Sequence, residues 1–509
     1  MTDGEDDTAG DAPAGSDAAD GTGEHAAAGG TAVRRDRFSG GPARGFMSSL
    51  DADRRIFAAD LAVSRAHVVM LAEQGIVDAD DAGAILGALA DVEAAGHADL
   101  PAAEDVHEAI ETAVIGRVGP EGGRMHTARS RNDEVAACIR YRLREDLLDA
   151  LETVVGAREQ LLAVADEHTE TLLPGFTHLQ YAQPVTVAHW VGSYEAALAR
   201  DTERLLAAYD RTNRSPLGAA AFAGTPFDVD RERTADLLGF DSVLDNSMDA
   251  VSTRDFLVET VSALATLATT LSGLAEDLVV YSGRDYLAIS DDYASTSSIM
   301  PQKKNPDTLE LVRATAGEAT GALGGLLTTL KSLPRSYNID LQEATPHAWR
   351  AIDAVPEALE VATGALATAD WNEGVLAAEA SAGFSTATGV ADRLAMAGVP
   401  FRTAHEVVAT AATRLEGDPD LAVLEAAAEE VLGESLTEYV DRETLAATLE
   451  PTGSVAMRDS RGGPAPEAVA ASLDRAREEV AADRSALSGH REAVADAATR
   501  RDEEVETYV

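Results

Sequence analysis

The chain has 509 residues, and its 88 Asp and Glu against 41 Lys and Arg give a formal net charge of −47 at pH 7. Such self-repulsion destabilises a compact chain at low salt, whereas molar salt shortens the Debye length to about 3 Å, so we expect a protein adapted to a very salty cytoplasm. The negative charge disfavours polyanionic partners such as nucleic acids and acidic membranes. The lone Cys138 excludes an intrachain disulfide and a multi-cysteine metal site. No run of the sequence approaches the ~20 apolar residues of a membrane span.

From the N-terminus onward, the sequence predicts an acidic tail followed by three helical parts. The tail consists of Gly, Ala, Asp and Thr with almost no large apolar residue, which is typical of disorder, and order is expected to begin near Arg37 and Phe38. The remainder is rich in Ala, Leu, Glu and Arg and is expected to be helical. The expected divisions are a tail (1–32), an N-terminal helical domain (33–130), a central domain of long helices (131–375), a C-terminal helical domain (376–480) and a charged terminal helix or tail (481–509).

The long helices carry the clearest periodicity. They are expected over 143–168, 191–212, 256–281 and 307–331. Within 256–281, apolar residues recur at spacings of four and three, at Leu257, Val261, Leu264, Ala268, Leu271, Ala275 and Leu278. This heptad seam is typical of a bundled helix. A helix of about 25 residues spans roughly 37 Å and cannot bury its seam alone, so we expect a bundle shared between subunits.

Three polar segments interrupt the helices, and the first is His126–Asp133. It combines Arg129 and Arg131 with Asn132 and two hydroxyl residues. Arginine binds carboxylates through two parallel hydrogen bonds, so this segment is a candidate carboxylate-binding loop. The alternative is a helix N-terminus capped by Ser130 or Asn132, with arginines that face solvent.

The second segment, Gly175–Pro184, places His178 among hydroxyl and amide side chains. A histidine titrates near neutral pH, so His178 is a candidate general acid or base. The alternative is a histidine that makes only a structural hydrogen bond.

The third segment, Asp291–Asp307, contains Lys303 and Lys304, and the only other lysine of the chain is Lys331. A chain that avoids lysine elsewhere keeps ammonium groups here, which indicates a chemical use. Lys303 and Asn305 can stabilise an anionic intermediate by charge and hydrogen bonding. The alternative is a salt-bridged surface turn.

Together these segments resemble the motifs of the fumarase/aspartase superfamily of lyases. Ser297–Pro306 is similar to its signature loop, and within the superfamily Gln302–Asp307, residues 126–133 and the Thr-His-Leu-Gln run at 177–180 favour the argininosuccinate lyase branch. Further matching runs are Asn246–Ala250, Leu333–Pro334, Tyr337–Asn338, Asp340–Glu343, Gly398–Arg402 and Ala404–His405. The resemblance covers nearly the whole chain after the tail.

The resemblance implies an all-α fold, a long-helix bundle of this superfamily with smaller N- and C-terminal helical domains. It also implies a homotetramer whose central bundle takes about five helices from each subunit. Each active site would combine the three segments from three different subunits. The implied reaction is the reversible elimination of fumarate from argininosuccinate to give arginine, the last step of arginine biosynthesis, with no cofactor and no metal.

Roles for individual residues also follow from the resemblance. Ser297 is the implied base and His178 the implied acid, while Lys303 and Asn305 hold the intermediate. The implied substrate-binding residues are Ser49, Arg131, Asn132, Thr177, Tyr337 and Gln342.

At four positions the chain departs from the family. Ala128 and Thr296 stand where the family has glycine, and Ile339 and Thr345 stand where its members commonly carry lysine. Two other functions remain open: a lyase for another fumaryl adduct, such as adenylosuccinate, and a non-catalytic relative akin to lens crystallins.

Overall fold

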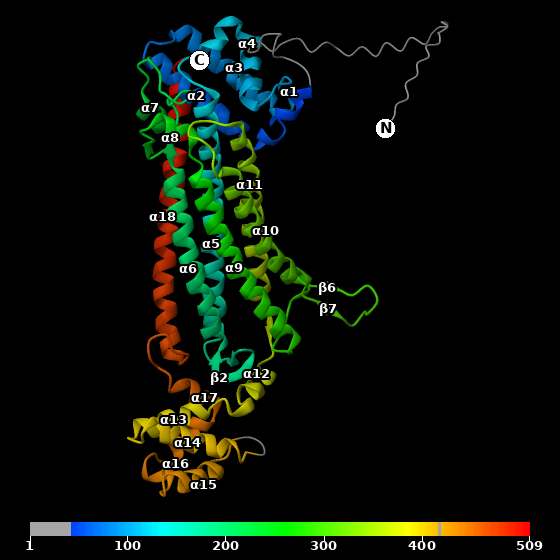
Figure 1. The fold of residues 1–509 in the computed structure, drawn as a ribbon, viewed down its shortest axis with the longest axis vertical. Helices are drawn as coiled ribbons and strands as arrows, with labels where there is room; N and C mark the ends of the chain where they lie inside the picture. The colour runs from blue at the N-terminus through cyan, green and yellow to red at the C-terminus, as the bar shows by residue number, and fades with distance from the viewer. Residues whose placement is uncertain (1–41, 416–418) are drawn as a thin grey trace, which may run out of the picture.

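The computed structural model describes residues 42–415 and 419–509. The predicted tail at 1–32 and the expected start of order near Arg37 lie outside these residues. The described chain is elongated, with a shaft of long helices that carries one helical domain at each end (Figure 1). The predicted all-α fold is confirmed.

Six long helices of the described chain form the shaft. They are α5 (Arg131–Glu167), α6 (Val187–Thr212), α9 (Asp255–Gly283), α10 (Asp307–Leu330), α11 (Thr345–Ala367) and α18 (Pro466–Glu506). All four predicted long helices are among them. α5 begins well before the expected residue 143, because Ser130 and Asp133 form a capping box that starts the helix at Arg131.

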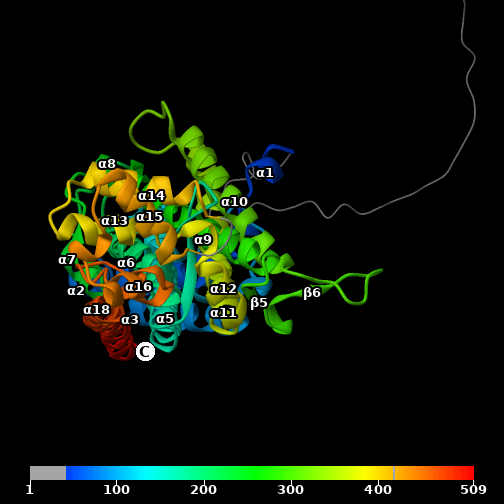
Figure 2. The ribbon, with the colours of Figure 1, turned by 90° about the horizontal axis from the view of Figure 1, so that it is seen from below.

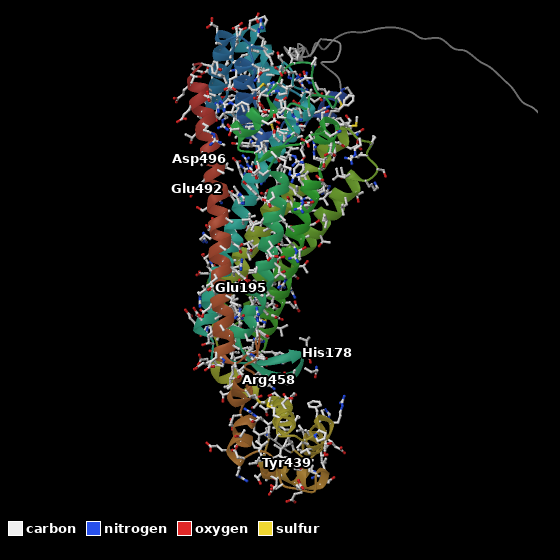
Figure 3. The ribbon with its side chains drawn as sticks, turned by 90° about the vertical axis from the view of Figure 1, so that its left-hand side faces the viewer. His178, Glu195, Tyr439, Arg458, Glu492 and Asp496 are labelled. Carbon is white, nitrogen blue, oxygen red and sulfur yellow. The ribbon has the colours of Figure 1, made fainter. Side chains whose placement is uncertain are left out.

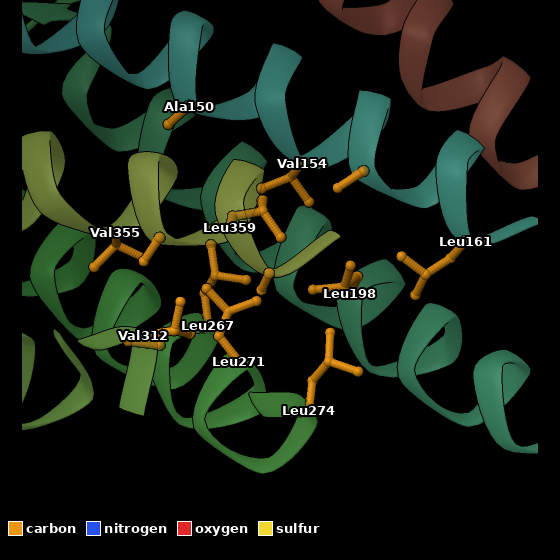
Figure 4. Close-up of a cluster of buried hydrophobic side chains, with 14 of the residues drawn as sticks. Ala150, Val154, Leu161, Leu198, Leu267, Leu271, Leu274, Val312, Val355 and Leu359 are labelled. Atoms are coloured by element: carbon orange, nitrogen blue, oxygen red, sulfur yellow. The ribbon is translucent and has the colours of Figure 1, made fainter. Parts of the chain in front are cut away.

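The predicted heptad seam lies in the core of the shaft. Each of its seven residues, from Leu257 to Leu278, is at most 1% exposed, and α9 packs against α6, α10 and α11. Figure 4 shows side chains from these helices and α5 meeting in one apolar cluster. By length and composition alone, α9 is the one described helix that would suit a membrane, but its buried seam identifies it as a core helix of this bundle.

The expected boundary at residue 480 falls inside a single helix. α18 runs from Pro466 to Glu506 and packs along α5 and α6 back toward the N-terminal domain. Its buried apolar residues, such as Leu473 and Leu487, are widely spaced. Exposed ion pairs also join it to the shaft, such as those of Arg484 with Glu152 and Glu159. Of the two expected forms, a charged terminal helix or a tail, this segment has the helix, which continues from residue 466 along the shaft.

The two ends of the shaft carry separate hydrophobic cores. The N-terminal domain consists of α1 (Pro42–Met47), α2 (Phe57–Glu73), α3 (Ala79–Ala95) and α4 (Val106–Val118), with α7 (Arg231–Leu238) and α8 (Ser247–Ser252) beside the shaft. The C-terminal domain consists of α12 (Glu373–Ala380), α13 (Ala387–Met396), α14 (Phe401–Ala412), α15 (Leu421–Val431), α16 (Arg442–Leu449) and α17 (Pro451–Ala456). Each domain buries its own apolar cluster.

Four short two-stranded pairings, none of them predicted, connect the helices of the described chain. They are β1 (Leu172–Thr177) with β2 (Gln180–Thr186), β3 (Arg214–Ser215) with β4 (Ser242–Val243), β5 (Leu287–Ala288) with β8 (Asp370–Trp371), and β6 (Ser295–Thr296) with β7 (Lys304–Asn305). Two of these pairs fall in the second and third polar segments. Both segments are therefore hairpins rather than irregular linkers.

Candidate active site

A cavity of about 320 Å³ lies where the N-terminal domain meets the shaft. It is lined by five of the six predicted substrate-binding residues, namely Ser49, Arg131, Asn132, Tyr337 and Gln342. Two come from the first turn of α5, two from the connection between α10 and α11, and one from the segment that precedes α2. Residues far apart in the sequence are thus brought into one site.

The first polar segment is both a helix cap and a wall of this cavity. Ser130 Oγ accepts a hydrogen bond from the Asn132 backbone N–H at 3.3 Å, and the Ser130 N–H donates to Asp133 at 2.9 Å. Arg129 does not face solvent as the alternative required, since its side chain is 1% exposed and pairs with Glu134 at 3.0 Å. The Arg131 guanidinium donates to Asp105 at 3.2 Å.

Backbone strain is present just before this cap. Ala128 has φ +63°, in the left-handed region that favours glycine. This explains why glycine is the expected residue there. The departure costs on the order of 1 kcal/mol.

Hydrogen bonds within the cavity hold the predicted substrate-binding side chains in place. Ser49 Oγ donates to Asp53 at 2.7 Å, and Asp53 also accepts from the Val106 N–H at 3.2 Å. The Gln342 amide donates to the Met47 carbonyl at 3.2 Å. Burial raises the pKa of Asp53 and of the Tyr337 hydroxyl.

A buried ion pair on the cavity wall was not predicted. His107 on α4 lines the cavity, and its Nδ1 donates to Asp60 of α2. Burial lowers the pKa of His107, but the Asp60 charge and hydrogen bond outweigh it and raise the value to about 10. Cys138 Sγ is also near these two side chains. The sequence gives no signal for this pair, because its members lie on different helices.

Thr177 and His178 lie on the β1–β2 hairpin at the other end of the shaft, where His178 projects from the side (Figure 3). Thr177 pairs with Gln180, so His178 and Leu179 form a two-residue turn with φ of +55° and +58°. Non-glycine residues in this conformation each cost about 1–2 kcal/mol. Such a conformation is the usual one in a two-residue hairpin turn, and it leaves the His178 side chain exposed at the turn.

The loop between β6 and β7 carries Ser297 and projects away from the shaft (Figure 2). Ser297 Oγ accepts hydrogen bonds from the backbone N–H groups of Met300 at 3.1 Å and Ile299 at 3.4 Å. The Ser297 N–H donates to the Lys303 carbonyl at 3.1 Å. Two N–H dipoles aimed at one oxygen stabilise negative charge on it.

The lysines of this segment divide into two kinds. The Lys304 ammonium pairs with Asp291 at 2.7 Å and so supports the base of the loop, as the surface-turn alternative would have it. The Lys303 side chain is exposed and makes no ion pair within the described part of the chain. Asn305 lies on β7 beside it. Lys303 is therefore available to an anionic ligand.

The ten predicted site residues do not meet within one chain. Arg131 starts α5, and Thr177 and His178 follow its C-terminal end. The 37 residues of α5 span roughly 55 Å. One chain therefore places the predicted site residues in three separate regions: the cavity, the His178 hairpin and the Ser297 loop.

Known proteins similar to this chain share this architecture. A family profile described as Lyase matches residues 44–321, and one described as Argininosuccinate lyase C-terminal matches residues 384–456. A protein named argininosuccinate lyase from Haloarcula marismortui is 69% identical over 482 residues, covering 94% of this chain and 97% of the relative. Another of that name, from Methanosarcina acetivorans, is 49% identical over 445 residues, covering 86% and 90%.

Solved structures agree with these sequence relatives. A crystal structure of EDDS lyase in complex with formate superposes with a TM-score of 0.82 at 33% identity, covering 92% of this chain and 96% of that one. A class II fumarase from Schistosoma mansoni has the same fold, with a TM-score of 0.65 at 14% identity, covering 78% and 90%.

Proposed function

The chain belongs to the argininosuccinate lyase family of the fumarase/aspartase superfamily, and from this premise we propose that it reversibly cleaves argininosuccinate into arginine and fumarate. We place this reaction in the cytoplasm, as the last step of arginine biosynthesis. The observation that carries the chemistry is the Ser297 loop, in which two backbone N–H groups converge on the hydroxyl oxygen. Such a group can act as a base, because its alkoxide is stabilised before substrate arrives.

Cleavage begins when Ser297 removes a proton from the carbon beside a succinyl carboxylate. The electron pair moves into that carboxylate and gives a dianionic aci-carboxylate, which Lys303 and Asn305 stabilise by charge and hydrogen bonding. The pair then returns to form the carbon–carbon double bond as the carbon–nitrogen bond breaks. His178 donates a proton to the departing guanidino nitrogen, so arginine and fumarate leave.

The assembly that we propose is a homotetramer with shared active sites. The cavity and the His178 hairpin lie roughly 55 Å apart along α5, so a complete site requires a second chain. α10 supports such contacts, because Leu311 and Leu327 are 69% and 49% exposed on this helix of the shaft. With Thr177, the cavity residues Ser49, Arg131, Asn132, Tyr337 and Gln342 would bind substrate in this assembly.

Fumarate absorbance in molar KCl tests the proposal. Argininosuccinate, adenylosuccinate and aspartate are supplied separately, and we expect fumarate from argininosuccinate alone. Fumarate from adenylosuccinate alone would assign the chain to another fumaryl adduct. No fumarate from any of the three at any salt concentration would favour a non-catalytic relative.

A further inference from the structure

Arg254, just before α9, carries a buried charge with no acidic partner in the described structure. The residue is 3% exposed and lines the cavity that holds Ser49 and Arg131. Its guanidinium donates to two carbonyls of its own segment, those of Thr253 at 2.8 Å and Val251 at 3.3 Å, and its Nε has no partner. A buried charge without a counter-ion is costly. Arg140 and Arg144 are also buried and paired only with neutral groups, but Arg254 alone of the three lines a cavity that can admit an anionic ligand.

A second buried guanidinium reinforces the positive charge at this end of the shaft. Arg140 on α5 is 2% exposed, stacks on the Phe256 ring at 3.9 Å and donates to the carbonyls of Arg211 and Thr212. Burial, followed by repulsion from Arg254, lowers the pKa of Arg140 to about 9. Burial likewise lowers the pKa of Arg254 to about 10.

The lining of the same cavity also contains acidic side chains. Asp53 and Asp105 line it, and Asp105 also caps α4 by accepting from the Glu108 N–H at 2.7 Å. Thr345, another lining residue, offers only a hydroxyl, which donates to the Gln342 carbonyl at 3.2 Å. The cavity therefore pairs a cation with carboxylates, which matches the carboxylate and ammonium groups of a free amino acid.

We infer that Arg254 binds the α-carboxylate of the arginine half of argininosuccinate and so selects an amino acid at that end of the substrate. The inference rests on the proposed function. In that mechanism the Ser297 loop, with Lys303 and Asn305, surrounds the fumarate half. The arginine half then extends into the cavity, where Arg254 is the buried cation without an acidic partner.

In the reverse reaction arginine condenses with fumarate, so the KM for each half of the substrate can be measured separately. In molar KCl, Arg254→Gln should raise the KM for arginine by about 10- to 100-fold, the effect of losing a charge-assisted hydrogen bond. The KM for fumarate should stay unchanged. Agmatine, which is arginine without the carboxylate, is the matched probe: the wild type should prefer arginine strongly, and Arg254→Gln should lose most of that preference.

Arg144→Gln is the matched control. Arg144 is equally buried and donates to the carbonyls of Leu238 and Gly239, but it does not line the cavity, so this variant should keep the preference for arginine. If Arg254→Gln does not fold, Arg254→Lys keeps the charge and should retain part of the preference.

Three results would overturn the inference: no preference for arginine over agmatine in the wild type, a full preference in Arg254→Gln, or an equal rise in both KM values. A wild type that forms no argininosuccinate would instead overturn the proposed function.

Discussion

Two inactive variants should complement each other, because the cavity and the His178 hairpin lie at opposite ends of α5. Arg131→Gln damages the cavity end, and His178→Asn damages the hairpin end. Losing an acid or a positioning group costs on the order of 100-fold in rate. Each variant alone should therefore form a tetramer of very low activity.

The size of the recovery follows from the geometry. Since roughly 55 Å separates the two ends, a complete site must take Arg131 from one chain and His178 from another. In an equimolar random mixture each residue is intact with a chance of one half, so about one quarter of the sites in a symmetric oligomer are intact. The mixture should show about one quarter of wild-type activity.

The assay refolds the two variants together at high salt and compares fumarate release with that of each variant refolded alone. Equal masses by light scattering ensure that only the composition of the tetramer differs. If the mixture is no more active than the average of the separate variants, both residues act in one chain, and the reasoning from the length of α5 is refuted.

Two further predictions concern stability. The pKa of His107 is raised from 6.5 to about 10 in the folded protein, so its contribution to the free energy of unfolding is fully present below about pH 6.5 and is lost as the pH rises toward 10. The difference in unfolding free energy between the wild type and His107→Gln, measured in chemical denaturant, should therefore shrink over that range. A constant difference would contradict the pairing of His107 with Asp60. Removing salt should dissociate or unfold the oligomer, because the net charge of −47 is no longer screened. Light scattering that finds a stable tetramer in dilute buffer would contradict the proposed salt adaptation.

The sequence predicted those parts of the fold whose signal is local. The α9 seam repeats every few residues, and each of its seven members is buried. The end of α18 was expected only as a charged terminal helix or tail, because its apolar residues, from Val469 to Ala497, are sparse and its carboxylates resemble a solvated tail. Beside α5 it makes ion pairs such as Arg484–Glu159. The two residues of such a pair are far apart in the sequence, so no local pattern reveals it.

The candidate site was predicted in its parts but not in its geometry. Motifs located the cavity residues, the hairpin and the loop, because each is a short polar run. His107 and Arg254 were missed, since one is defined by a partner on another helix and the other by the absence of an acidic partner in the described structure. The distance between the parts depends on the length of α5, whose first turns lay outside the expected helix.

The central claim is that Ser297 is the base that converts argininosuccinate into arginine and fumarate. Quantifying both products from one reaction in molar KCl tests it most directly, with the wild type beside Ser297→Ala. We predict equal amounts of arginine and fumarate from the wild type, and a loss of both by a factor of at least ~10² in a variant of unchanged mass. Wild-type rates from Ser297→Ala, or no products from the wild type, would contradict the account.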